Sequence, residues 1–256
     1  EQSLMDRWVG KVALVTGASA GIGAATIEAL VQEGLQVVGV ARRVDKIEKI
    51  AEKLINAKGK LYAMQCDVSK EEDILAVFEW IKENLGGVDV LVNNAGVMHP
   101  ASLSDGDTEG FRRILDVNVL GVALHTREAV RSMKARQVDG HIFNVNSVLG
   151  HYLFSPSDQY SLYPSSKFAV TAMTEVTRKE LIKANTKIKI TSISPGFVKT
   201  EIIAAAVGEE ISEEIYKAHP SLNSEDVANA IIYALGTPPH VQICELVIRP
   251  VGELLA

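Results

Sequence analysis

The chain has 256 residues, with 26 lysines and arginines against 32 aspartates and glutamates, and a formal net charge of −6. A hydrophobic fraction of 47% is enough for a large buried core. The negative charge excludes the broad basic surface that non-specific nucleic-acid or membrane binding requires. No run of about 18 apolar residues is present, so we expect no membrane span.

The two cysteines, Cys66 and Cys244, form neither a CxxC pair nor a zinc-ligand spacing. We therefore expect no disulfide framework, no metal site, and a location in the reducing cytoplasm. The N-terminus lacks the apolar segment of a signal peptide. Residues 1–4 precede Met5 and are expected to be a remnant of expression, whereas residues 5–256 are expected to form one domain.

Short apolar runs alternate with segments of helical spacing along the chain. In chain order the pattern predicts a strand at 11–16, a helix at 21–33, a strand at 36–41, a helix at 45–57, a strand at 60–65, a helix after Ser69, a strand at 88–92, a long helix at 108–135, a strand at 140–145, a long helix at 160–184, a strand at 187–194, one or two short helices at 200–218, a helix at 224–235 and a strand at 243–248. Ser69 is expected to cap its helix, with Glu72 in the capping-box position.

Strands buried on both faces and joined through helices make right-handed crossovers in a parallel sheet. The sequence therefore predicts an α/β fold, a Rossmann-type doubly wound parallel sheet of about seven strands with helices on both faces. In such sheets ligands bind beyond the carboxyl ends of the strands. The motifs below all fall at that edge.

A glycine-rich turn joins the first strand to the first helix. It reads TGASAGIG over residues 16–23. Glycines there let backbone amides approach a pyrophosphate at the positive end of the helix. An ordinary tight turn is the alternative, but the strand before and the helix after favour a dinucleotide. The predicted cofactor-binding residues of this turn are Gly17, Ser19, Ala20, Gly21, Ile22 and Gly23.

The end of the second strand predicts which dinucleotide binds. An NAD-binding chain usually carries an acidic residue there, whereas this chain has Arg42 and Arg43. Guanidinium groups bind a 2′-phosphate through charge-assisted bonds, so we predict NADP(H), with Arg42 the firmer ligand. The alternative is that both arginines are solvated charges at the start of a helix. Asp45 is expected to cap that helix rather than contact a ligand.

Two further strand ends add candidate cofactor contacts. Asp67 could meet an adenine amino group and Val68 could pack on the ring, although Asp67 could equally be a loop or cap residue. Asn94, Ala95 and Gly96 follow the fourth strand, where they either form a turn or contact the adenosine ribose.

Six motifs in order resemble the classical short-chain dehydrogenases/reductases. They are TGASAGIG, NNAG at 93–96, Asn118 in DVNVLG, Ser147, YPSSK at 163–167 and SPG at 194–196. The opening MDRWVGKVALVTGAS, the VARR strand end and the ending TPPHVQICELVIRP are similar to the branch that holds insect farnesol dehydrogenases and a vertebrate cytosolic NADPH-dependent carbonyl and ketosteroid reductase. The resemblance implies a homodimer or homotetramer.

Tyr163 and Lys167 lie four residues apart on one helix and so share a face. An ammonium there, with the charge of oxidised nicotinamide, is expected to lower the phenol pKa and make Tyr163 the general acid and base. Lys167 is also expected to hold the nicotinamide ribose. By resemblance Ser147 binds the substrate oxygen and Asn118 anchors a water. Asparagine is a poor helix former, which is a separate hint of function at Asn118.

The segment after the sixth strand is expected to cover the substrate. By resemblance Pro195, Gly196, Val198 and Thr200 lie near the nicotinamide and phosphates. Residues 197–222 mix apolar and acidic side chains and are expected to form a lid with its apolar face toward the substrate. The expected substrate contacts are Ser147, Leu149, Tyr160, Tyr163, Phe197 and Ile202.

The apolar face expected of the lid, together with the resemblance, favours hydride transfer to or from an apolar alcohol or carbonyl compound. Farnesol, farnesal and a ketosteroid are examples. Two alternatives stay open: a broad-specificity xenobiotic or dicarbonyl reductase, and a catalytically silent NADP(H)-binding regulatory protein. The six histidines have no paired ligand spacing and are interpreted as non-catalytic. His99 and His151 fall near the expected mouth of the site.

Overall fold

One parallel sheet of seven strands runs through the protein. The computed structural model describes residues 3–153 and 162–253. The strands are β1 (Val12–Thr16), β2 (Gln36–Ala41), β3 (Lys60–Gln65), β4 (Val90–Asn93), β5 (His141–Val145), β6 (Lys189–Pro195) and β7 (Glu245–Ile248). Their order is β3-β2-β1-β4-β5-β6-β7, with every pair parallel. The predicted doubly wound fold is confirmed.

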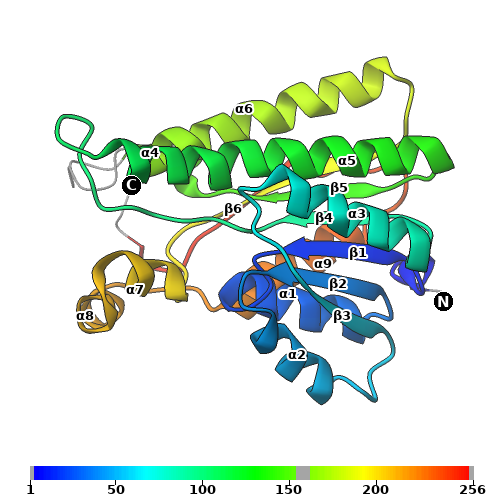
Figure 1. Cartoon of the computed structure of the whole chain (residues 1–256), viewed down its shortest axis with the longest axis horizontal. Coiled ribbons are helices and arrows are strands. Elements are labelled where there is room, and N and C mark those ends of the chain that lie inside the picture. The colour runs from blue at the N-terminus through cyan, green and yellow to red at the C-terminus, as the bar shows by residue number, and fades with distance from the viewer. Residues whose placement is uncertain (1–2, 154–161, 254–256) are drawn as a thin grey trace.

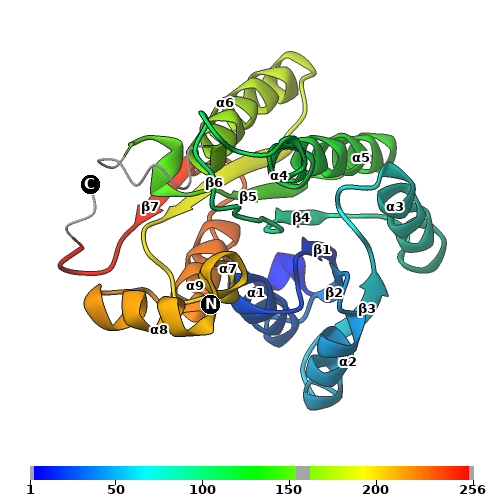
Figure 2. The ribbon, with the colours of Figure 1, turned by 60° about the vertical axis from the view of Figure 1, so that its left-hand side comes forward.

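Helices cover both faces of the sheet (Figures 1 and 2). The helices are α1 (Gly21–Gln32), α2 (Val44–Lys53), α3 (Glu71–Leu85), α4 (Thr108–Leu115), α5 (Gly121–Arg136), α6 (Leu162–Lys183), α7 (Glu201–Val207), α8 (Glu209–Ala218) and α9 (Ser224–Leu235). Figure 2 shows α1, α2 and α9 on one face and α3, α5 and α6 on the other. No helix in the described part of the chain has the length and apolar character needed to cross a bilayer.

The alternation of side chains along the strands divides the core into two layers. Ala13 and Val15 pack with α1 and α9, whereas Leu14 between them packs with α3 and α5. All of β1 is buried because both faces are covered. From β1 the chain turns one way to β2 and β3 and then crosses back to β4. The change of direction between β1 and β4 marks the position at which such sheets bind ligands.

The long helix expected at 108–135 has a wider turn inside it. A π-helical turn, Asp116–Leu120, separates α4 from α5 and contains the buried Asn118. Such turns are uncommon and gather at functional sites. The helical spacing of the apolar residues predicts the length of the segment, but it carries no signal for the extra residue in this turn.

Two predicted helix caps are wrong. The helix after Ser69 begins at Glu71 with Lys70 in the cap position, and Ser69 instead donates its hydroxyl to Asp67 Oδ1 at 2.7 Å. Asp45 is the second residue of α2, whose cap position is Arg43. Its charge still lies in the first turn, where it favours the helix dipole. In both cases the helix begins at a different residue from the one that the cap pattern predicts.

Candidate active site

The glycine turn after β1 is shaped by close backbone contacts. Gly17 and Gly21 have φ of +65° and +54°, in the left-handed region that favours glycine. A Cβ on Gly23 would clash with the carbonyl oxygen of Gly17. The cap position of α1 is Ala20, which offers no side-chain acceptor, and Ile22 follows in the first turn. The first amides of α1 therefore face a cradle without a side-chain cap of their own.

The end of β4 braces this turn. Asn94 donates its Nδ2 to the carbonyl oxygens of Thr16, at 2.9 Å, and Gly17, at 3.3 Å. The backbone amides of Asn94 and Ala95 both donate to Thr16 Oγ1 at 3.0 Å. A Cβ on Gly96 would meet only ordinary contacts. Asn94 and Ala95 thus hold the turn in shape, and a ribose contact stays a prediction for this segment.

Two arginines lie exposed after β2. Arg43 pairs with Glu201 at the start of α7 at 2.7 Å and reaches Ser19 Oγ at 3.5 Å. Lys46 pairs with the same carboxylate at 3.1 Å. Glu201 was not singled out from the sequence, since the two partners lie far apart along the chain. Arg43 therefore lies directly beside the glycine turn, as a cofactor contact would require.

At the end of β3 the carboxylate of Asp67 is already engaged. Its Oδ1 accepts hydrogen bonds from the backbone and the hydroxyl of Ser69. Burial opposes ionisation, but these bonds and the charge of Arg42 outweigh it and lower the pKa of Asp67. Val68 is buried against the core. Asp67 keeps its charge near Arg42, and an adenine contact stays a prediction.

The predicted catalytic residues come together beyond β5. Ser147 lies two residues after the end of this strand, and its Oγ accepts a hydrogen bond from the backbone amide of Leu149 at 3.1 Å. Lys167 Nζ donates to the carbonyl oxygen of Val145 at 2.9 Å and lies 5.6 Å from the ring centre of Tyr163. Ser147, Tyr163 and Lys167 are all less than a tenth exposed. A phenol and an amine thus share a buried corner next to the last residues of β5.

Asn118 links this corner to the loop after β4. Its Oδ1 accepts the amide of Val97 and its Nδ2 donates to the carbonyl of Val97, both at 2.9 Å. The Nδ2 also donates to Ser166 Oγ at 3.0 Å, and Ser166 donates to the carbonyl of Tyr163. Ser166 was missed as a functional residue, although it lies inside the YPSSK motif. The π turn therefore places Asn118 between the β4 loop and the tyrosine helix.

Burial is the main influence on the pKa values of Tyr163 and Lys167. It raises the pKa of Tyr163 above its usual range and lowers the pKa of Lys167 to about 8. The expectation that the neighbouring amine lowers the phenol pKa does not hold for the protein alone, because removal of water outweighs the nearby charge. At neutral pH Tyr163 is a neutral phenol that can donate a proton.

The segment after β6 returns to the glycine turn. Pro195 ends β6, and the amide of Gly196 donates to the carbonyl of Ile248 at 2.7 Å. A Cβ on Gly21 would lie 3.2 Å from the methyl carbon of Thr200. Thr200 is therefore next to the start of α1, and a contact with the phosphates stays a prediction. Val198 is buried and pairs with Leu222.

The segment 197–222 forms two helices with an exposed apolar surface. Tyr216 of α8 accepts the amide of Thr200 at 3.0 Å and packs its ring 5.2 Å from Phe197. No residue of α7 is buried, so Ile202 and its apolar neighbours keep partly open faces. Tyr216, which anchors α8 to the strand end, gave no signal in the sequence. Tyr160, an expected substrate contact, lies outside the described residues.

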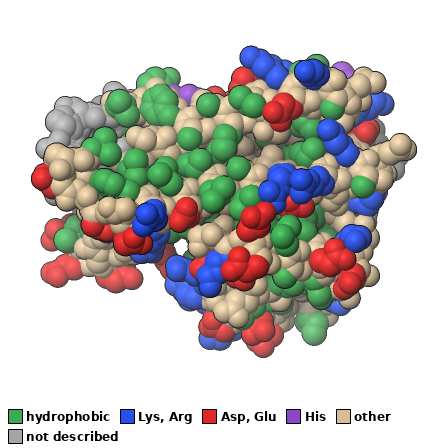
Figure 3. Space-filling model, turned by 45° about the horizontal axis from the view of Figure 1, so that its top comes forward, with side chains coloured by type: hydrophobic (Ala, Val, Ile, Leu, Met, Phe, Trp, Pro, Cys, Tyr) green, Lys and Arg blue, Asp and Glu red, His purple; other side chains and the backbone are tan. Residues whose placement is uncertain are grey.

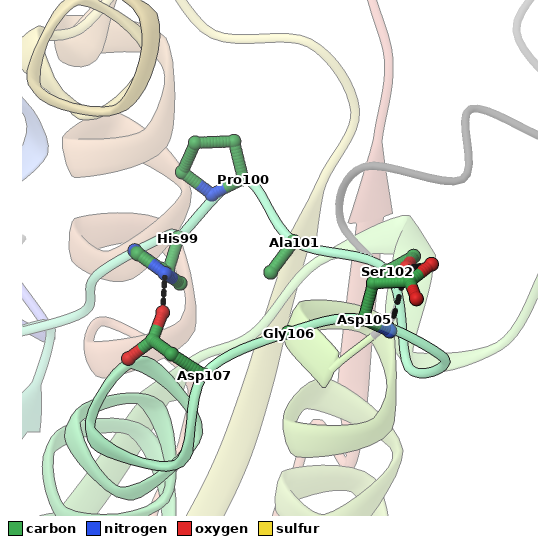
Figure 4. A pocket seen from close by; sticks show the side chains of 7 residues that line it. All are labelled: His99, Pro100, Ala101, Ser102, Asp105, Gly106 and Asp107. Carbon is green, nitrogen blue, oxygen red and sulfur yellow. Dashed lines mark hydrogen bonds and ion pairs between the residues drawn. The ribbon is translucent and has the colours of Figure 1, made fainter.

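A cavity of 560 Å³ opens in the loop after β4, at the same edge of the sheet. It is lined by His99, Pro100, Ala101, Ser102, Asp105, Gly106 and Asp107 (Figure 4). In Figure 4 His99 and Asp107 face one another, with Nε2 and Oδ2 2.9 Å apart. No predicted site residue among those that the structure describes lines this cavity, but Asn118 holds the same loop through Val97.

Replacing Lys167 by methionine is expected to stabilise the protein without ligand by about 1–3 kcal/mol at pH 7. The ordinary Lys pKa is 10.5 and the folded value about 8. Between these values the unfolded chain binds more protons, so wild-type stability rises with pH there. Above about pH 10 it falls again, because Tyr163 keeps its proton only in the folded state. Melting curves from pH 6 to 11 measure both limbs.

The methionine variant should lose the rise between pH 8 and 10, because the buried amine is gone. Lys49→Met, on the exposed face of α2, is the matched control and should keep the wild-type profile. An unchanged rise in Lys167→Met would contradict the assignment of this limb to Lys167.

Comparison with known proteins identifies the family of the chain. The family described as short chain dehydrogenase matches residues 11–210. The chain is 52% identical over 251 residues to the farnesol dehydrogenase of Aedes aegypti, covering 97% of this chain and 99% of that one. It is 49% identical to dehydrogenase/reductase SDR family member 11 of Gallus gallus, covering 98% and 100%.

Solved structures of dehydrogenases are also similar to this chain. An alcohol dehydrogenase of Thermococcus sibiricus, complexed with 5-hydroxy-NADP, superposes with a TM-score of 0.84 and 29% identity, over 96% of this chain and 99% of that one. Solved neighbours hold NADP in some cases and NAD in others, so the fold alone does not select the cofactor. The resemblance that the motifs indicated is confirmed: the chain belongs to the short chain dehydrogenase family.

Proposed function

We propose that the protein is an NADP(H)-dependent oxidoreductase that moves a hydride between nicotinamide and an apolar alcohol or carbonyl compound. The observation that carries this proposal is the buried corner of Ser147, Tyr163 and Lys167 at the strand edge that also holds the glycine turn. Membership of an oxidoreductase family, with a farnesol dehydrogenase among the relatives, supports the same reaction type.

The residues at the edge of the sheet fit a dinucleotide with a 2′-phosphate. Glycines with left-handed backbone and an α1 start without a side-chain cap leave room and free amides for a pyrophosphate. Arg43 lies beside Ser19 of the turn, and the exposed Arg42 precedes it. The strand end itself carries two guanidinium groups and no carboxylate, which favours NADP(H) over NAD(H). Arg43 would exchange its ion pair with Glu201 of α7 for the 2′-phosphate. Lys167 would hold the nicotinamide ribose, and residues 195–200 would flank the ring.

The bound cofactor supplies the hydride for carbonyl reduction. Tyr163 donates its phenolic proton to the carbonyl oxygen, which suits a phenol that burial keeps neutral. Ser147 Oγ already accepts the amide of Leu149, so its own hydrogen can donate to the same substrate oxygen. Lys167, fixed by the carbonyl of Val145, places a cation beside the phenol. In the oxidation direction the same groups act in reverse, with Tyr163 as base after it has lost its proton, and the charges of Lys167 and of oxidised nicotinamide would favour that phenolate.

We propose that residues 197–222 form the substrate lid and that farnesol, farnesal or a ketosteroid is the substrate class. The half-open apolar side chains of α7 support this, Ile202 and Val207 among them. Turnover of a substrate panel with NADPH and NADP⁺ tests the proposal. Farnesol, farnesal and a steroid ketone should be converted at least ~10-fold more efficiently than a short hydroxy acid, since each buried methylene adds about 0.8 kcal/mol. Equal efficiencies would contradict it.

The outer surface of the α4–α6 layer supports the proposed homodimer or homotetramer. Leu115, Leu120, Phe168 and Val176 are each at least 41% exposed there. Figure 3 shows hydrophobic side chains gathered over this layer. Contiguous apolar surface of this kind usually marks an interface. The two cysteines are free thiols, which agrees with the proposed cytoplasmic location.

A double substitution, Leu120→Glu with Phe168→Glu, is expected to convert the assembly to monomers, because four buried carboxylates per dimer would face an apolar surface. Light scattering after size exclusion measures the mass. Val9→Glu with Ile55→Glu, exposed positions outside this layer, is the charge-matched control and should leave the mass unchanged. A wild-type monomer would contradict the proposed assembly.

A further inference from the structure

A second pocket lies at the opposite edge of the sheet from the candidate active site. Its volume is 380 Å³, within the range of small-molecule sites. It opens where β5 and β6 begin, toward the side of the N-terminus in Figure 1. We propose that this amino-end pocket binds a small multiply charged anion of about the size of pyrophosphate.

Positive charge dominates the wall of the amino-end pocket. Arg7, Lys11, Lys187 and Lys189 all line it. Of the two carboxylates in the wall, Asp89 is already neutralised: it accepts Arg136 at 2.9 Å and the amide of Val12 at 2.9 Å. Only the exposed Asp139 offsets the four cations. An anion of several charges is the ligand that such a wall attracts.

One of the cations, Lys189, is buried and a second, Arg7, is half-buried, and both are held in place. Lys189 is 7% exposed, and its Nζ donates to the carbonyl of Pro238 at 2.8 Å. Arg7 donates through NH2 to the carbonyl of Leu235 at 2.9 Å, and stacks over the ring of Trp8. Burial and the charge of Arg7 both lower the pKa of Lys189, so these two groups repel one another without a counter-charge.

The backbone carbonyls of Leu235 and Pro238 satisfy some of the hydrogen-bond donors of Arg7 and Lys189, but not all of them. Arg7 NH1 is buried, and no hydrogen-bond partner for it exists among the described residues. A buried donor without an acceptor is costly, and a ligand oxygen would satisfy it. Lys11 and Lys187 are exposed, and in the described ranges no hydrogen bond or ion pair engages either amine. Both are free to close over a bound anion.

The pocket is separate from the dinucleotide site. The glycine turn, Arg42 and Tyr163 follow the carboxyl ends of strands, whereas Lys189 is the first residue of β6 and Lys11 precedes β1. An anion bound here would therefore not compete with a nicotinamide dinucleotide. Trp8 lies in the wall and Trp80 on α3, so the two tryptophans of the chain give a built-in reporter and its control.

Titration of the full chain with inorganic pyrophosphate tests the proposal. The protein is first saturated with whichever of NADP⁺ and NAD⁺ binds it, so that the nucleotide site is filled. Calorimetry should give one site with a dissociation constant below about 1 mM that weakens as salt is added. Tryptophan fluorescence should change in wild type and in Trp80→Phe, and the change should disappear in Trp8→Phe.

Lys11→Gln with Lys187→Gln should weaken binding at least ~10-fold, since two charge-assisted contacts are lost. Both side chains are exposed, so the fold should persist. Lys49→Gln with Lys53→Gln on α2 removes the same charge elsewhere and should bind like wild type. No heat of binding, an equal loss in both double variants, or an unchanged signal in Trp8→Phe would overturn the proposal.

Discussion

Tyr163→Phe is expected to lower the rate of carbonyl reduction by about 10³-fold while the dissociation constant for NADPH stays within about twofold. The variant loses only the phenolic hydroxyl, so the ring still fills its buried place beside Lys167. A developing alkoxide then has no proton donor, and Ser147 alone can only hydrogen-bond to it. Steady-state rates and fluorescence titration of NADPH measure the two quantities.

Tyr233→Phe is the matched control. Tyr233 lies exposed on α9, away from the strand edge, so the same atom is removed where no chemistry is proposed. Its rate should equal that of wild type. If Tyr163→Phe kept more than a tenth of the wild-type rate while folded, Tyr163 would not be the general acid.

Removing both arginines after β2 is expected to reverse the cofactor preference. Arg42→Ala with Arg43→Ala should weaken NADPH at least ~100-fold, because each charge-assisted bond to the 2′-phosphate contributes about 1.5–3 kcal/mol. NADH has no such phosphate, and its affinity should change less than about threefold. Fluorescence titration with both cofactors measures the ratio.

NADH in the same double variant controls for general damage to the turn. Lys53→Ala with Lys49→Ala, further along α2, removes equal charge and should leave the ratio unchanged. An equal loss for both cofactors would mean that the arginines only shape the loop. A wild-type preference for NADH would contradict the proposed NADP(H) dependence itself.

The sheet could be predicted from the sequence because its central strands are buried on both faces and so read as continuous apolar runs. The strands at 36–41 and 60–65 and the helix at 224–235 have the predicted bounds. The motif residues could also be placed, because parallel strands bring their carboxyl ends to one edge of the sheet. At Asn118 the sequence indicated an unusual position, because asparagine is a poor helix former, and the structure has a π turn there.

The rest depends on contacts between segments that the local pattern does not encode. The π turn around Asn118 adds a residue that helical spacing does not show. The pairing of Arg43 with Glu201 and the anchoring of Thr200 by Tyr216 join residues whose distance only the folded chain determines. The pKa of Tyr163 was predicted from its neighbour Lys167, but the deciding quantity is burial, which a sequence states only indirectly.

Hydride transfer from the cofactor to the carbonyl carbon is the central claim, and deuterium labelling tests it most directly. The wild-type protein is incubated with farnesal and NADPH in which both hydrogens at C4 of the nicotinamide are deuterium, and the product is examined by mass spectrometry. The account predicts farnesol with one deuterium on the carbon that bears the hydroxyl. Unlabelled farnesol, or no farnesol at all, would contradict it.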